Sequence, residues 1–186
     1  MKPYAYDTGF LIGRFQHFHL GHECLVDTLQ LLCKRIIIFV GSSQESGTLR
    51  NPFNVSTRIA IIKEIYGDSV EVYGLSDMTT EDDVCYEWGD YLFNHFYQIY
   101  SKYPDVMCYG NDEARSHWCR PEMIKKTLEI IVPRGIVTDI SATKLRRFIV
   151  DDDRVQWMAN TNPLLHSRYP DIRSELMSVP DYRNMK

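Results

Sequence analysis

The sequence lacks any apolar run near membrane-spanning length. A helix needs roughly 20 consecutive apolar residues to cross a bilayer, and no stretch of this chain approaches that length. The first residues also lack a basic segment followed by an apolar stretch of signal-peptide length. We therefore expect a soluble, cytoplasmic protein that does not bind membranes.

Paired cysteines are also missing. The 5 cysteines are scattered without any C-x-x-C pair, and their odd number argues against a disulfide framework. Free thiols in a reducing compartment are expected instead.

Several motifs of other enzyme classes are absent. There is no G-x-x-x-x-G-K-[ST] and no G-x-G-x-x-G, which disfavours a P-loop kinase and a dinucleotide-dependent dehydrogenase. No G-x-S-x-G nucleophile elbow occurs either.

Charge of one sign does not dominate the chain. The formal net charge is −4, which creates no general field attracting nucleic acid, and we expect no nucleic-acid partner. Local clusters of cations suit a small anionic ligand better than a duplex. The cations in question are Arg14, Arg50, Arg58, Arg134, Lys144, Arg146 and Arg147.

Strand-like and helix-like segments alternate along the chain. Strands are expected at 8–12, 35–40, 70–75, 106–109 and 128–132, and helices at 20–34, 56–66, 87–103 and 143–150. The run 36–40 is apolar at every position, as is typical of a central parallel strand. The alternation predicts an α/β fold, a doubly wound (Rossmann-like) parallel sheet with helices on both faces, whose ligand site lies beyond the carboxyl ends of the strands.

A length of 186 residues fits one domain with a sizeable core. We expect residues 1–150 to form the catalytic α/β domain. Residues 151–186 should form a C-terminal extension of short helices and loops packed on that domain, because prolines interrupt it repeatedly.

The segment G-R-F-Q-H-F-H-L-G-H, at 13–22, joins the first expected strand to the first expected helix. A helix N-terminus presents free N–H groups and the positive end of a dipole to an anion. His19 and His22 add side-chain donors at the same place, Arg14 adds a cation, and Gly21 leaves room for close backbone approach. This arrangement predicts a polyphosphate site.

A second segment, I-S-A-T-K-L-R at 140–146, offers related chemistry. Ser141 is a natural N-cap for the helical run that follows. Thr143 places a hydroxyl in the first turn, and Arg146 supplies a cation.

These segments resemble the two signatures of the nucleotidylyltransferase superfamily, H-x-G-H and I-S-x-T-x-x-R. The longer form G-R-F-Q-x-F-H-x-G-H is similar to that of its nicotinamide mononucleotide (NMN) adenylyltransferase branch. The R-N-P-F block at 50–53, which follows Gly41 and Ser42, also resembles a block of that branch. Together the matches span roughly residues 9–150.

The resemblance implies an adenylyltransferase that joins ATP to NMN, giving NAD and pyrophosphate. It implies Mg²⁺ bound with ATP, no metal site made by the protein, and a homo-oligomer. The implied catalytic residues are His19, His22, Arg14 and Arg146, and the implied nucleotide-binding residues are Gly13, Phe15, Gln16, Gly21, Arg50, Asn51, Trp88, Gly110, Asn111, Ser141 and Thr143.

The chain departs from the family pattern at two positions. His17 stands where the motif usually has proline, which removes a rigid φ and is expected to place a third imidazole beside the phosphate site. Thr57 stands where the branch has an acidic residue. Trp88 lies about where the branch has a tryptophan that stacks on nicotinamide, but it also belongs to an aromatic-rich helical stretch in which packing alone would explain it.

Other interpretations remain open. Within the superfamily, the acceptor could be nicotinate mononucleotide, phosphopantetheine, or a phosphorylated alcohol with CTP as the donor. From another class, the chain could be a non-catalytic nucleotide sensor. A zinc site made by His17, His19 and His22 is disfavoured because no acidic or thiolate partner stands in the adjacent motif positions.

Overall fold

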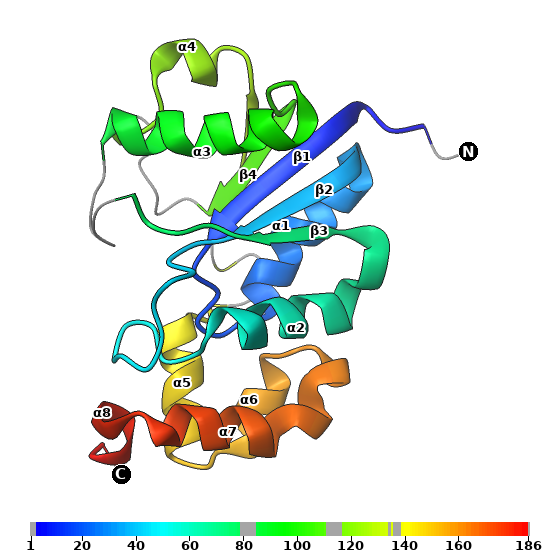
Figure 1. The fold of residues 1–186 in the computed structure, drawn as a ribbon. Helices are drawn as coiled ribbons and strands as arrows, with labels where there is room; N and C mark the ends of the chain where they lie inside the picture. The colour runs from blue at the N-terminus through cyan, green and yellow to red at the C-terminus, as the bar shows by residue number, and fades with distance from the viewer. Residues whose placement is uncertain (1–2, 79–84, 111–116, 134, 136–138, 186) are drawn as a thin grey trace.

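A computed structural model of the chain describes residues 3–78, 85–110, 117–133, 135 and 139–185. Their strands form one parallel sheet of 5 strands in the order β3-β2-β1-β4-β5 (Figure 1). The strands are β1 (Tyr6–Gly13), β2 (Cys33–Val40), β3 (Glu71–Gly74), β4 (Val106–Gly110) and β5 (Leu128–Val132). The strand order reverses between β1 and β4, and the carboxyl ends at such a switch point are where open α/β sheets bind ligands.

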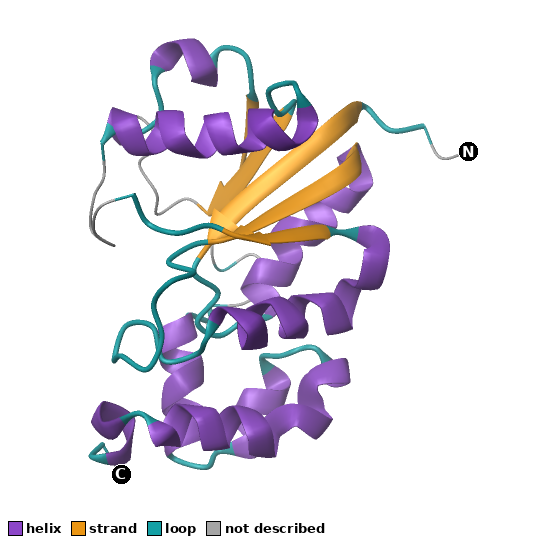
Figure 2. Cartoon of the chain, in the orientation of Figure 1, coloured by secondary structure: helices purple, strands orange, loops and turns teal. Residues whose placement is uncertain are grey.

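Helices cover both faces of the sheet (Figures 1 and 2). On one face lie α3 (Tyr86–Tyr100) and α4 (Pro121–Ile124), and on the other lie α1 (Leu20–Leu32) and α2 (Val55–Tyr66). The predicted doubly wound parallel fold is therefore confirmed. Among the helices that the structure describes, none is both long enough and apolar enough to cross a membrane.

Two helix ends differ from the prediction. The helix expected to reach Lys34 ends at Leu32, because Cys33 already pairs with Tyr6 as the first residue of β2. The helix expected to reach Tyr103 ends at Tyr100, where Ser101 turns into a left-handed conformation with φ of 55°. Serine carries no strong stop signal of the kind that glycine gives.

The sheet separates two apolar cores, and β2 contributes to both. Side chains alternate between the faces of a strand, so Ile36 and Ile38 face one core while Ile37 and Phe39 face the other. This two-sided burial explains why every position from 36 to 40 is apolar.

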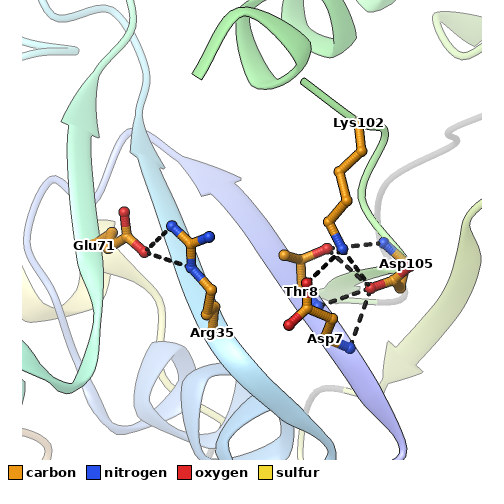
Figure 3. Close-up of polar contacts among 6 residues, drawn as sticks. All are labelled: Asp7, Thr8, Arg35, Glu71, Lys102 and Asp105. Carbon is orange, nitrogen blue, oxygen red and sulfur yellow. Dashed lines mark hydrogen bonds and ion pairs between the residues drawn. The ribbon is translucent and has the colours of Figure 1, made fainter. Parts of the chain in front are cut away.

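Polar contacts connect the amino-terminal ends of the strands (Figure 3). The carboxylate of Asp105, just before β4, accepts hydrogen bonds from the backbone N–H of Thr8 at 2.8 Å and its hydroxyl at 3.0 Å. Arg35 on β2 pairs with Glu71 on β3 at 3.0 Å. These contacts fasten neighbouring strands at the edge opposite the carboxyl ends.

The C-terminal extension is helical. It follows α5 (Ala142–Val150) and contains α6 (Arg154–Ala159), the 3₁₀ helix η3 (Pro163–Arg168), α7 (Tyr169–Ser178) and α8 (Pro180–Arg183). The extension packs beside α2 and α5 and away from the sheet (Figure 1). Buried side chains of the extension, such as Trp157 and Leu176, share one apolar core with Ile62 of α2 and Leu145 of α5.

Candidate active site

A cavity of about 400 Å³ lies at the carboxyl ends of β1, β4 and β5. Segments that are far apart in the sequence meet there: the turn after β1, the segment containing Arg50, the end of β4 and the start of α5. Most of the predicted site residues line it, namely Gly13, Arg14, Phe15, Gln16, His19, Gly21, His22, Arg50, Gly110, Thr143 and Arg146.

The H-x-G-H turn holds its two imidazoles by aromatic packing. His19 is the N-cap of α1, and the ring of His22 stacks on it with centroids 3.8 Å apart and planes at 19°. The Phe15 ring meets the His22 ring edge-on with centroids 4.9 Å apart, and the centroid of the Phe18 ring lies 5.3 Å from that of His22. Both imidazoles are therefore held in place at the cavity wall before any ligand arrives.

Phe15 supports this packing from an unusual backbone conformation. Its φ is 51°, in the left-handed region that costs a bulky residue free energy, and its side chain is buried. Such conformations persist where surrounding structure holds them, and they cluster at functional sites.

Gly21 makes room for a side chain. A Cβ at this position would lie 3.0 Å from both Cε1 and Nδ1 of His19, closer than ordinary carbon contacts. The glycine in the motif is therefore needed so that the His19 ring can lie over the first turn of α1.

The start of α5 forms the opposite wall. Ser141 caps the helix, since its hydroxyl accepts a hydrogen bond from the Lys144 N–H at 3.2 Å. Thr143 and Arg146 line the cavity one turn apart, and an Nη2–H of Arg146 donates to the Thr143 hydroxyl at 3.3 Å. Arg146 also donates from Nη1 to the carbonyl of Gln16, which connects this wall to the turn after β1.

The electrostatics of the cavity favour an anion. Arg14, Arg50 and Arg146 line it together with the two histidines. Helices α1 and α5 both begin at its wall, so the positive ends of their dipoles point to the cavity. No aspartate or glutamate occurs among the lining residues that the structure describes. A polyphosphate matches this charge and donor pattern.

Two other predicted cations, Lys144 and Arg147, do not line the cavity. Lys144 pairs with Asp139 at 3.0 Å, and Arg147 pairs with Asp151 at 2.7 Å, both on the surface. Arg134 lies outside the residues that the structure describes.

Arg58, grouped by sequence with the ligand-binding cations, is a structural residue. Its side chain is 1% exposed, and burial lowers its pKa to about 10, so it stays charged at neutral pH. The guanidinium donates to backbone carbonyls, and its partners are Arg14 at 3.0 Å, Gly41 at 2.7 Å, Ser42 at 3.0 Å, Glu45 at 3.4 Å and Asn54 at 3.3 Å. Arg58 therefore ties the loops after β1 and β2 to α2.

Gln16 and Asn51 hold each other. The Gln16 amide donates to the Asn51 side chain at 3.3 Å and exchanges two hydrogen bonds with the backbone of Phe53, at 3.1 and 2.9 Å. Asn51 is buried and is not among the lining residues, and neither is Ser141. Asn51 supports Gln16, and Ser141 caps the helix that carries Thr143 and Arg146, so both residues position parts of the cavity wall. Direct contacts of Asn51 and Ser141 with a ligand stay predictions.

Trp88 is not brought to the cavity. It lies in the first turn of α3, where its ring meets Trp118 edge-to-face at 4.9 Å and 83° and packs against the core under α3. Stacking on nicotinamide stays a prediction for Trp88. Asn111, also predicted at the site, lies outside the described residues.

The expectation of a third imidazole beside the phosphate site is wrong. His17 is completely buried beneath the turn, with Phe53 at 5.7 Å and Trp157 at 5.9 Å from its ring, and it does not line the cavity. Burial, with smaller contributions from His19 and Arg146, lowers the His17 pKa to about 3. Within the described part of the chain, no three His, Cys, Asp or Glu side chains are grouped to hold a metal.

Sequence reasoning missed the apolar part of the lining. Ile12, Tyr109, Val132 and Pro133 end or follow strands, and the position of strand ends was the signal available for them. Leu25 lies on α1 and Ile140 precedes α5, and the position of strand ends marks neither one.

Comparison with known families identifies the class of protein. Residues 10–164 match the family model described as cytidylyltransferase-like. The chain belongs to this family, and the predicted nucleotidylyltransferase resemblance is confirmed.

Particular relatives point to one branch. The nicotinamide-nucleotide adenylyltransferase of Archaeoglobus fulgidus is 27% identical over 170 residues, covering 77% of this chain and 98% of that protein. Nicotinamide-nucleotide adenylyltransferase 1 of Sulfolobus acidocaldarius is 28% identical over 155 residues, covering 78% and 79%. The predicted similarity to the NMN branch is confirmed.

Solved structures share the fold. A bifunctional NMN adenylyltransferase/ADP ribose pyrophosphatase from Francisella tularensis, complexed with AMP and a Mn ion, has a TM-score of 0.71 at 20% identity. The match covers 95% of this chain and 53% of that one, so this chain spans about half the bifunctional protein. A Plasmodium falciparum nicotinic acid mononucleotide adenylyltransferase complexed with NaAD has a TM-score of 0.58 at 13% identity, covering 96% and 98%.

Proposed function

We propose that this protein is a nicotinamide-nucleotide adenylyltransferase, which joins ATP to NMN and releases pyrophosphate. One observation carries the proposal: three remote motif segments form a single cavity that has histidines, arginines and two helix N-termini, and no described acidic residue. Both archaeal relatives quoted above bear this activity in their names, and the chain covers 98% of one of them.

The reaction needs positioning and charge stabilisation more than a protein nucleophile. A 5′-phosphate oxygen of NMN attacks the α-phosphorus of ATP, and the bond from that phosphorus to the bridging oxygen breaks. Pyrophosphate leaves with the electron pair. In this proposal His19 and His22 stabilise the charge on the phosphoryl oxygens, while Arg14 and Arg146 hold the triphosphate.

Mg²⁺ fits this site as a companion of ATP. Because no carboxylate occurs among the described lining residues, ATP phosphate oxygens and water would supply its ligands, as this ion usually accepts. When bound, the ion would neutralise phosphate charge, and the arginines and histidines of the cavity would act on the remaining oxygens.

The test is pyrophosphate release by the purified protein with ATP and Mg²⁺, run in parallel with NMN, nicotinate mononucleotide and phosphopantetheine, and repeated with CTP. We expect pyrophosphate release with the pair ATP and NMN and with no other pair. Release with another pair would retain the nucleotidyltransferase and reject the NMN assignment. No release with any pair, while ATP still binds, would reject the enzyme in favour of a nucleotide sensor.

A further inference from the structure

The C-terminal extension reaches the cavity through Tyr182 of α8. The Tyr182 hydroxyl accepts a hydrogen bond from Nε of Arg146 at 2.6 Å and donates one to the carbonyl of Leu49 at 2.7 Å. The side chain is 4% exposed, so this hydroxyl sits in a buried position with both of its roles used. Leu49 directly precedes Arg50, another residue of the cavity lining.

A second contact from the extension holds the segment 49–54 at its other end. Glu175 of α7 accepts hydrogen bonds from the backbone N–H of Asn54 at 2.9 Å and from its side-chain amide at 2.6 Å. The other carboxylate oxygen of Glu175 accepts from the Thr57 hydroxyl at 2.7 Å. The extension therefore contacts the chain on both sides of Arg50, at Leu49 through Tyr182 and at Asn54 through Glu175.

Arg146 is oriented by these contacts. A guanidinium has five N–H donors, and three different nitrogens of Arg146 are engaged, by Tyr182, by the Gln16 carbonyl and by Thr143. The remaining N–H groups belong to Nη1 and Nη2, the pair whose fork geometry suits a phosphate. Loss of the Tyr182 hydroxyl would free Nε and allow the guanidinium to rotate.

We propose that Tyr182 is a positioning residue for triphosphate binding, which acts by fixing the guanidinium of Arg146 and the backbone beside Arg50. Its role gives the C-terminal extension a function in the site. The inference rests on the proposed function only in that a nucleoside triphosphate occupies the cavity.

The test uses the full-length chain with Tyr182→Phe, which keeps the buried ring and removes the hydroxyl. Tyr169→Phe is the matched control, because Tyr169 is a buried tyrosine of the same extension whose hydroxyl donates to Asp152 at 2.9 Å, outside the cavity lining. Dissociation constants for ATP, inorganic triphosphate and AMP are measured by calorimetry, and thermal unfolding is measured for each variant.

We expect Tyr182→Phe to bind ATP and triphosphate about ten-fold more weakly, because binding would then have to immobilise the guanidinium that the hydroxyl no longer holds, with a smaller effect on AMP. Tyr169→Phe should lower the unfolding temperature without changing these affinities. Equal ATP affinity in folded Tyr182→Phe and in the unaltered chain would overturn the inference.

A double-mutant comparison separates positioning from general packing. If Tyr182 acts through Arg146, adding Tyr182→Phe to Arg146→Ala should weaken ATP binding little further. Full additivity of the two losses would contradict the inference. A chain that binds ATP and triphosphate but makes no NAD would reject the proposed function, and the affinity comparison would still decide the role of Tyr182.

Discussion

The imidazole rings of His19 and His22 stack face to face, with centroids 3.8 Å apart, at the N-terminus of α1. Each ring packs on the other, and the rings of Phe15 and Phe18 also pack against His22. The pair is a preorganised donor array at the place where the strand order reverses. Preorganised donors stabilise developing charge without a reorganisation cost at the moment of reaction.

His22→Ala should lower kcat on the order of 10²–10³-fold, the loss typical of one preorganised donor. Steady-state pyrophosphate release measures the effect. His95→Ala is the control, since His95 lies on α3 and does not line the cavity. Full turnover by His22→Ala would remove the histidine from the mechanism.

Gly21→Ala should separate stability from activity. Alanine favours a helix over glycine by up to about 1 kcal/mol, so the free energy of unfolding should not fall sharply. The new methyl group would press on the His19 ring, from which a Cβ lies only 3.0 Å, and should reduce kcat on the order of ten-fold through misplacement. Unchanged kcat would show that the position of His19 does not matter.

Arg58→Lys should destabilise the protein even though the charge is kept. An ammonium has three donors on one nitrogen and cannot replace the five hydrogen bonds that the guanidinium makes from three nitrogens, and each lost hydrogen bond from a charged donor costs about 1.5–3 kcal/mol. Urea unfolding measures the change. Arg35→Lys is the control, because its ion pair with Glu71 is partly exposed to solvent, and lysine keeps a charge whose contribution there should be about 1 kcal/mol or less.

His17 should make the protein less stable in mild acid. Its pKa is lowered to about 3 in the folded state, chiefly by burial, from 6.5, so the unfolded chain binds the proton first as the pH falls. The stability that neutral His17 contributes is therefore present in full above pH 6.5 and is lost progressively as the pH falls from 6.5 to 3. At pH 5 the loss from this group is about 2 kcal/mol relative to pH 7.

The measurement is urea unfolding at pH 7 and pH 5 for the unaltered chain and for His17→Leu, which has no titrating group. The difference in stability between the two pH values should shrink by about 2 kcal/mol in His17→Leu. An identical pH dependence in both chains would show that His17 is not the residue responsible.

Local patterns predicted the sheet and much of the site. Apolar runs such as 36–40 mark strands regardless of their partners, and the H-x-G-H turn holds several cavity-lining residues within a few positions. Side-chain direction was harder to predict. Composition alone cannot show that Arg58 points into the protein while Arg50 lines the cavity.

Contacts between residues far apart in the sequence account for the features that the sequence did not predict. Tyr182 meets Arg146 across 36 positions, and Glu175 meets Asn54 across 121, in an extension that carries no motif. The burial of His17 depends on Trp157 of the same extension. No periodicity within either segment encodes such pairings, so they appear only in the folded structure.

Adenylyl transfer breaks the bond between the α-phosphorus and the β-phosphate of ATP, so isotopic labels on the phosphorus atoms distinguish it from other phosphoryl transfers. With NMN and Mg²⁺ present, label at the α-phosphorus should pass into NAD, and label at the γ-phosphorus should appear in pyrophosphate. Transfer of the γ-label to the mononucleotide, or release of the γ-label as inorganic phosphate, would rule out adenylyl transfer, because either requires a different bond to break.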